Sequence, residues 1–185
     1  MTDTRTRILD AALAVMSRHG LSRLALEDVA REAGVSRQTV YRHMESRERL
    51  ITATIVREEE AFLTRMTSAM HPDQALQEAL RSAILEALRA AREHPLLDRL
   101  MAAEPEALLP FLTNGQGPVL SVAKEVVREL LGRWVGHLGE EQLELVSEAT
   151  TRLIVSYAIS PPAESSEKLA DGLAEMIACG VAPRP

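Results

Sequence analysis

The chain has 185 residues, of which 46% are hydrophobic and 3% aromatic, and its formal net charge is −6. It can therefore form the core of one large domain or two small ones from Leu, Ala, Val, Ile and Met, a mixture that favours helix over sheet. This charge excludes a nucleic-acid-binding protein that is basic along its whole length. The charges are unevenly distributed, however: residues 1–50 carry nine arginines and seven acidic residues, whereas residues 51–185 carry 12 basic and 20 acidic residues. The N-terminal part is therefore slightly basic.

The N-terminal stretch predicts a helix from about Asp3 to His19, ended by Gly20. Its apolar residues recur at helical spacing and form one stripe, made of Ile8, Leu9, Ala12, Leu13 and Met16. Residues 1–5 show no signal-peptide pattern, and no apolar run is long enough to span a membrane. The single cysteine, Cys179, excludes a disulfide framework within the chain. We therefore expect a cytoplasmic protein.

Residues 26–44 predict two short helices joined by a tight turn. The first helix has an apolar stripe made of Leu26, Val29, Ala30 and Ala33. Gly34 is suited to leave a helix in a left-handed conformation, and Ser36 is a good N-cap for the next helix, which buries Val40 and Met44. This is the layout of a helix-turn-helix, whose second helix enters the major groove. The alternative is an ordinary helical hairpin with a solvated polar face.

The second helix leaves polar side chains around its outer side, namely Arg37, Gln38, Thr39, Tyr41, Arg42 and His43. Arginine and glutamine make paired hydrogen bonds to guanine and adenine, so Arg37 and Gln38 are predicted to read bases. Thr, Tyr and His more often hold phosphate, which fixes register rather than sequence. Arg47, at the start of the next helix, is predicted to support binding to every duplex.

Five motifs within residues 4–53 carry a resemblance to the TetR family of bacterial transcriptional regulators. They occupy residues 7–12, 28–30, 33–36, 41–43 and 46–50, in the family's order and spacing. The resemblance implies an all-α fold of about nine helices, with a three-helix helix-turn-helix DNA-binding domain over residues 1–48. Residues 49–185 would form a helical domain for effector binding and dimerisation. It further implies a homodimer that binds a palindromic double-stranded DNA operator and is released by a small-molecule effector, without a cofactor.

Several positions depart from the family's pattern, including Met16 and Met44, which stand where phenylalanine is common. The family usually has threonine or serine just before the second helix, where this chain has Leu24 and Ala25, and Ser22 is the nearest hydroxyl that could take that place. Gln38 stands where the family often has glycine, so its side chain is available to reach a base. Arg47 replaces the usual lysine and keeps the charge.

The chain after the helix-turn-helix reads as a succession of helices, predicted over residues 46–70, 73–93, 96–101, 105–112, 118–138, 140–159 and 163–179. The first of these would be on the order of 35 Å long. It is long enough to leave the DNA-binding domain and enter a second layer. A ligand that shifts this helix would then move the DNA-binding domain.

Large or soft apolar side chains after residue 60 are the candidates for a small-molecule pocket. They are Phe62, Met66, Met70, Leu100, Met101, Phe111 and Trp134, with His137 and Glu104 as polar candidates. This set predicts a largely apolar effector. The alternative is that each residue belongs to an ordinary core.

The helices predicted around residues 140–159 and 163–180 carry small residues beside large ones, which permits close helix approach. The resemblance implies that they pair with their counterparts in a second chain as a four-helix bundle. Such a dimer would place two recognition helices about one DNA turn apart, roughly 34–36 Å or somewhat more. The alternative is that these helices cap the core of the monomer.

Patterns of catalysis and of metal binding are missing from the sequence. No two of the five histidines lie three or four residues apart, and there is neither a G-x-S-x-G motif nor a phosphate-binding loop. The prediction is therefore a ligand-responsive transcriptional repressor rather than an enzyme. Two alternatives stay open: a DNA-binding protein of this fold controlled by a protein partner, and a small helical enzyme whose N-terminal domain is only structural.

Overall fold

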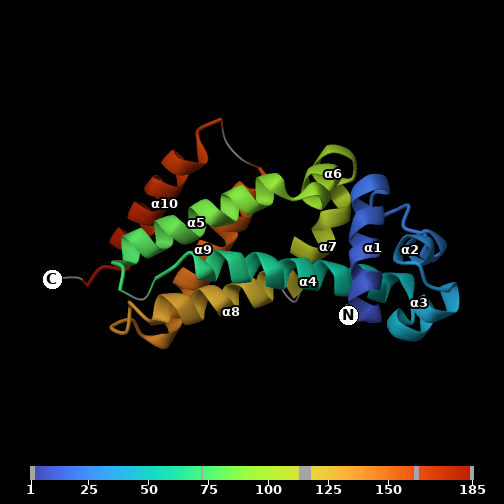
Figure 1. The fold of residues 1–185 in the computed structure, drawn as a ribbon. Coiled ribbons are helices and arrows are strands. Elements are labelled where there is room, and N and C mark those ends of the chain that lie inside the picture. Colours follow the sequence, from blue (N-terminus) through green and yellow to red (C-terminus); the bar gives the residue numbers. More distant parts are fainter. Residues whose placement is uncertain (1–2, 72, 113–117, 161–162, 184–185) are drawn as a thin grey trace. The chain divides into compact units, whose positions relative to one another are not determined.

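The computed structural model describes residues 3–71, 73–112, 118–160 and 163–183. These residues form helices and no strand, which confirms the predicted all-α fold (Figure 1). The elements are α1 (Thr4–His19), α2 (Leu26–Ala33), α3 (Arg37–Met44), α4 (Arg47–Ser68), α5 (Leu76–Glu93), α6 (Pro95–Ala103), the 3-10 helix η1 (Pro105–Leu108), α7 (Leu109–Leu112), α8 (Pro118–Gly132), α9 (Glu140–Ile159) and α10 (Ser166–Gly180). Within the described ranges, no helix combines the length and the apolar character that crossing a bilayer requires.

The chain divides into two compact units. The first unit consists of Met1–Glu60 and His94–Pro110, and the second unit of Ala61–Glu93 and Phe111–Pro185. The first unit therefore takes in residues 49–60 and 94–110, which lie beyond the predicted domain boundary between residues 48 and 49. The later segment belongs to it because α6 packs against α1.

The first unit is organised around the buried stripes of its short helices. The stripe predicted for α2 is buried, and so are Val40 and Met44 of α3. Gly34 follows α2 with φ +63°, the left-handed conformation expected of it. The Ser36 hydroxyl caps α3 by accepting a hydrogen bond from the backbone N–H of Thr39 at 3.1 Å. The predicted helix-turn-helix is therefore present in detail.

The turn between α3 and α4 contains a conformation that the sequence did not predict. Glu45 has φ +62° and ψ −47°, and the backbone N–H of Ser46 donates to the carbonyl oxygen of Met44 at 2.6 Å. These features define a γ-turn, which is strained for a residue with a side chain. The Ser46 hydroxyl then caps α4 by accepting from the N–H of Arg49 at 3.1 Å.

The second unit is a bundle in which α5 packs against α10 and α9, and α8 packs against α9 (Figure 1). Its apolar core includes Ile84, Leu88, Leu131, Val135 and Leu173. The burial of these aliphatic side chains is the main force that holds the bundle together.

Three helices of the second unit differ from their predicted ranges, and one of them is α5, which begins at Leu76 rather than at residue 73. The helix predicted over residues 118–138 ends at Gly132, because the glycines at 132 and 136 weaken a helix and the chain turns instead. The indole N–H of Trp134, just past that turn, donates to the carbonyl oxygen of Gln74 at 3.0 Å. The last helix begins at Ser166 rather than residue 163, because the Ser165 hydroxyl caps it.

Candidate nucleic-acid interface

The outer side of α3 carries unpaired polar side chains, and its inner side is apolar and buried. Gln38 and Arg42 are exposed and make no hydrogen bond or ion pair with any residue that the structure describes. Val40 and Met44, on the opposite side of the helix, are buried and fix its orientation. Two of the predicted DNA-binding side chains are therefore available for an external partner.

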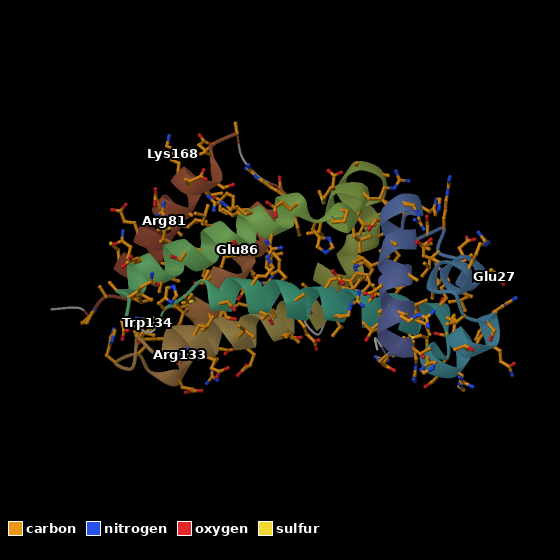
Figure 2. The ribbon with its side chains drawn as sticks, in the orientation of Figure 1. Glu27, Arg81, Glu86, Arg133, Trp134 and Lys168 are labelled. Carbon is orange, nitrogen blue, oxygen red and sulfur yellow. The ribbon has the colours of Figure 1, made fainter. Side chains whose placement is uncertain are left out.

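Arg37 is exposed but held by two neighbours. Its Nη1 lies 2.5 Å from Oε1 of Glu27 on α2, and its Nη2 donates to the hydroxyl oxygen of Tyr41 at 3.2 Å. The guanidinium carbon also lies 5.3 Å from the centroid of the Tyr41 ring, within the range of a cation–π contact. Figure 2 shows Glu27 pointing outward from α2. The hydrogen bond with Tyr41 and the charge of Glu27 raise the pKa of Arg37, so the group stays charged.

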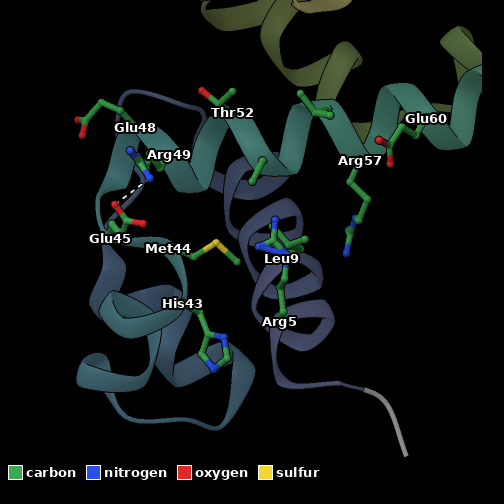
Figure 3. A pocket seen from close by; sticks show the side chains of 12 residues that line it. Arg5, Leu9, His43, Met44, Glu45, Glu48, Arg49, Thr52, Arg57 and Glu60 are labelled. Atoms are coloured by element: carbon green, nitrogen blue, oxygen red, sulfur yellow. Dashed lines mark ion pairs between the residues drawn. The ribbon is translucent and has the colours of Figure 1, made fainter.

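Thr39 and His43 are less available than the sequence predicted. The Thr39 hydroxyl lies 2.9 Å from the Ser36 hydroxyl, and the two share a hydrogen bond. His43 is half-buried and extends, with Arg5, towards a groove between α1, α3 and α4 (Figure 3). This groove has a volume of about 660 Å³ and is lined by Arg5, Leu9, His43, Met44, Glu45, Glu48, Arg49, Thr52, Ala53, Val56, Arg57 and Glu60.

Arg47 binds the protein's own backbone. Its Nε donates to the carbonyl oxygen of Leu24 at 2.9 Å, and its Nη2 donates to the carbonyl oxygens of Leu21 and Ser22. The guanidinium therefore satisfies carbonyl groups in the connection between α1 and α2. The structure gives this residue a positioning role that its place in the sequence did not indicate.

The same connection is held by Glu104, which follows α6. The Glu104 carboxylate accepts from the backbone N–H of Ser22 at 3.0 Å and from the Ser22 hydroxyl at 2.9 Å. Ser22 therefore does not cap α2, whose N-cap Ala25 has no side-chain cap. The hydrogen bond from the backbone N–H of Ser22 is the main reason that the pKa of Glu104 is lowered, and the bond from the Ser22 hydroxyl lowers it further. Glu104, a polar pocket candidate in the sequence, is committed to this contact.

The arginines of the first unit fall into paired and free groups. Arg7 donates to the carbonyl oxygen of Ala33 at 2.6 Å. Other arginines form ion pairs with carboxylates of the same unit, namely Arg18–Glu32, Arg31–Asp28, Arg49–Glu45 and Arg57–Asp10. Arg5, Arg23 and Arg42 make no such contact within the described part of the chain. Arg5 and Arg23 are thus additional phosphate-binding candidates, which sequence reasoning missed because pairing depends on distant partners.

The candidate effector residues lie in both units. Met66 belongs to the core of the second unit, and Phe62, Met70 and Trp134 pack against that core. Leu100 and Met101 belong to the first unit, where Leu100 is buried and Met101 exposed. Phe111 is half-buried. His137 Nε2 lies 2.8 Å from the carbonyl oxygen of Val181, so this ring already has a partner within the second unit.

α4 carries two adjacent carboxyl groups in contrasting environments. Glu58 lies 3.4 Å from His94 Nε2 and 2.9 Å from Arg57, and the hydrogen bond with His94 is the main reason that the pKa of Glu58 is lowered. Glu59 is 9% exposed, and neither of its carboxyl oxygens has a hydrogen-bond partner among the described residues. Burial, aided by the charge of Glu60, raises the pKa of Glu59 to about 8.

The last two helices leave apolar and small residues on their outer sides. Leu145 of α9 is 69% exposed and Met176 of α10 is 52% exposed. Ala149 and Gly172 are exposed as well, and a Cβ atom added at Gly172 would meet nothing within 4 Å. The packing of a single chain does not require these residue types at these positions.

Comparison with known proteins agrees with the geometry of the first unit. Residues 8–54 match the family model described as "Bacterial regulatory proteins, tetR family". Residues 75–179 match the model described as "Bacterial Tetracyclin repressor, C-terminal domain". The chain belongs to the TetR family. It is therefore a DNA-binding transcriptional regulator, of a kind that is typically a ligand-responsive repressor.

Individual relatives cover nearly the whole chain. The transcriptional regulator AlkX of Mycobacterium tuberculosis is 28% identical over 94% of this chain and 82% of its own length. The regulator UidR of Escherichia coli is 24% identical over 94% of this chain and 91% of its own length. The crystal structure of the TetR family repressor AlkX from Dietzia sp., implicated in biodegradation of n-alkanes, is 30% identical over 96% and 94%, with a TM-score of 0.74.

Regulators of the TetR family bind DNA operators and small-molecule effectors, usually as dimers, and the relatives are regulators rather than enzymes. Among the described residues there is also no group of three or more His, Cys, Asp or Glu that could hold a metal ion. The family membership thus favours the regulator over the small helical enzyme considered from the sequence.

Proposed function

We propose that this TetR family member is a homodimeric repressor that binds a palindromic operator through α3 and releases it when an apolar effector binds the C-terminal helices. The observation that carries the DNA-binding part is the face of α3. Arg37, Gln38 and Arg42 stand exposed there, above buried Val40 and Met44. A recognition helix needs this combination, because its inner side must be fixed while its outer side meets base edges.

Within this proposal, Arg37 and Gln38 read bases, whereas Tyr41, Arg42, Thr39 and His43 hold or face the phosphate backbone. The assignment rests on donor geometry, since the guanidinium and the carboxamide can make bidentate contacts to single bases. Arg47 acts on DNA binding through the backbone carbonyls that it holds, rather than through phosphate.

The experiment is selection of bound duplexes from a random pool, followed by affinity measurements on the selected operator and on a random duplex. Arg37→Ala and Gln38→Ala should each lower the operator-to-random ratio by roughly 5- to 150-fold, the range expected for loss of one bidentate base contact. Arg81→Ala is the matched control, because Arg81, labelled in Figure 2, lies in the second unit. It pairs with Asp171 of the same unit. An unchanged ratio in both α3 variants would refute the assignment.

The proposed dimer interface is the outer side of α9 and α10. Its support is the exposure of Leu145 and Met176 and the open space around Gly172. Met176→Glu should convert the dimer to a monomer in light scattering and weaken operator binding. Val122→Glu changes an exposed apolar residue of α8 and should leave the dimer intact. A dimer that survives both Met176→Glu and Leu145→Glu would contradict this interface.

The effector is proposed to be apolar for two reasons. The Dietzia AlkX repressor is implicated in biodegradation of n-alkanes, and Phe62, Met70 and Trp134 are half-buried against an aliphatic core. Operator-bound protein should release DNA on titration with n-decane at lower concentration than with decanoate, and Phe62→Ala should weaken that response. Release by decanoate alone would contradict the apolar assignment.

A further inference from the structure

The contacts of Arg37 differ from those of the other ion-paired arginines on the surface of the first unit. Among the described residues, Arg18, Arg31 and Arg49 each meet a carboxylate and no aromatic ring. Arg37 meets a carboxylate on α2 and an aromatic residue one turn along α3. The two neighbours, Glu27 and Tyr41, approach it from different helices. We refer to Arg37, Glu27 and Tyr41 as the Arg37 cluster.

The Arg37 cluster reduces the cost of using its guanidinium. Ordering a long, exposed side chain on binding costs conformational entropy. Glu27 at 2.5 Å and the Tyr41 hydroxyl at 3.2 Å already restrict Arg37 in the free protein. Each contact needs one of the five N–H groups of the guanidinium, so enough donors remain for a paired contact with guanine.

The cluster also removes most of the attraction that Arg37 would have for phosphate. Non-specific affinity for DNA arises from cations that neutralise phosphates. Glu27 is half-exposed beside Arg37, so the pair carries little net charge towards a passing backbone. A base edge that accepts the remaining hydrogen bonds of Arg37 still stabilises the complex. A base that cannot accept them gains neither these hydrogen bonds nor a strong attraction between Arg37 and phosphate.

We propose that Glu27 is a specificity-determining positioning residue: together with Tyr41 it holds Arg37 for base reading and prevents Arg37 from binding phosphate. This inference rests on the proposed function, in which α3 reads the major groove. Glu27 need not touch DNA to act in this way. Its carboxylate works through the direction and the effective charge of one guanidinium.

The test compares Glu27→Gln with Glu32→Gln. Glu32 is the matched control, because it lies on the same helix and pairs with Arg18 at 2.5 Å. In Glu27→Gln, freed Arg37 should take one more phosphate, so the plot of log affinity for random duplex against log salt should steepen by about 0.9. Affinity for random duplex should rise by about 3- to 10-fold at low salt, and the operator-to-random ratio should fall at least fivefold. Glu32→Gln should stay within about twofold of wild type in both.

A second comparison separates positioning from a general charge effect. In an Arg37→Ala background, the change from Glu27 to Gln should no longer alter the salt slope or the ratio. An effect that persists there, or a Glu27→Gln variant that behaves like Glu32→Gln, would overturn the inference. If the wild-type protein binds no duplex at all, the proposed function itself is refuted. If Arg37→Ala loses discrimination while Glu27→Gln keeps it, only the role of Glu27 is refuted.

Discussion

The two units use arginine and glutamate side chains in different ways. In the first unit, Arg7, Arg47 and Glu104 bond to backbone groups that lie 26, 23 to 26 and 82 residues away, respectively. In the second unit, most ion pairs join side chains of neighbouring helices, as in Arg81–Asp171 and Arg89–Glu167. The difference implies that charged side chains anchor distant backbone groups in the first unit, in addition to its apolar core, whereas those of the second unit mainly pair with one another at the surface.

This comparison has an energetic basis. Exposed ion pairs contribute about 0–1 kcal/mol, because water and salt screen them and ordering the side chains costs entropy. A charged group that satisfies a backbone carbonyl or N–H contributes about 1.5–3 kcal/mol, and its loss leaves a polar group without a partner. Substitutions of matched residue types in the two units therefore test the comparison directly.

The largest effect is expected for Gly20→Ala. Gly20 has φ +87° and ψ 170°, a conformation almost confined to glycine, and an added Cβ would lie 1.9 Å from Oε1 of Glu104. Strain and displacement of the Glu104 anchor should together cost about 2–4 kcal/mol, lowering Tm by roughly 4–16 °C. Gly136→Ala, whose Cβ would meet nothing within 4 Å, is the control for thermal unfolding. Equal Tm values for the two variants would break the comparison.

Arg47→Ala should follow in size. Removal of its bonds to three carbonyl groups should cost about 1.5–3 kcal/mol and weaken operator and random duplex alike, because the whole connection before α2 loosens. Arg81→Ala, which removes one exposed pair in the second unit, should cost less than about 1 kcal/mol. Denaturant unfolding of both variants measures the difference. The distinction between the units fails if Arg81→Ala costs as much.

Glu59 is an exception to the polar anchoring of the first unit, and its effect depends on pH. The unfolded carboxyl ionises near pH 4.3, whereas the folded one has a pKa of about 8. The folded state therefore loses stability as the pH rises from about 4.3, and the loss levels off above pH 8. Between pH 5 and pH 8.5, the free energy of unfolding of Glu59→Gln should fall by about 1–3 kcal/mol less than that of the wild type. Exposed Glu78→Gln is the control, and parallel stability curves for Glu59→Gln and wild type would rule this out.

The smallest effect is expected for Glu45→Gly. Glycine should relieve the strain at φ +62°, but it adds freedom to the unfolded chain and removes the ion pair of Glu45 with Arg49 at 2.7 Å. The net gain should be about 0.5 kcal/mol. Glu45→Ala loses the same pair and keeps the strain, so its Tm should lie below that of Glu45→Gly. The reverse order would show that the turn is not strained.

The features that were predicted correctly from the sequence are local ones. The turn after α2 and the cap of α3 follow from Gly34 and Ser36, whose conformational roles depend on neighbours within a few residues. The buried stripes follow from helical spacing for the same reason. The end of α8 at Gly132 was missed, because apolar spacing continued past a glycine that ends the helix.

The features that were missed depend on distant partners. Arg47 was assigned to DNA, yet its donors meet carbonyl groups of the connection between α1 and α2, and nothing in its local sequence separates the two roles. Glu104 was considered for the effector pocket, yet it binds Ser22. The predicted pocket residues divide between the units, because large apolar side chains mark cores and pockets alike.

The first unit is discontinuous in the sequence, since its second segment returns after residues 61–93 have contributed to the other unit. Recombination between two related regulators at a single crossover near residue 60 would therefore separate Gly20 and Ser22 from the glutamate that meets them. Chimeras that exchange operator preference should retain their fold only if residues 94–110 travel with the N-terminal segment. Substitutions at Gly20 or Ser22 are then expected to be accompanied by substitutions at Glu104 as such genes diverge.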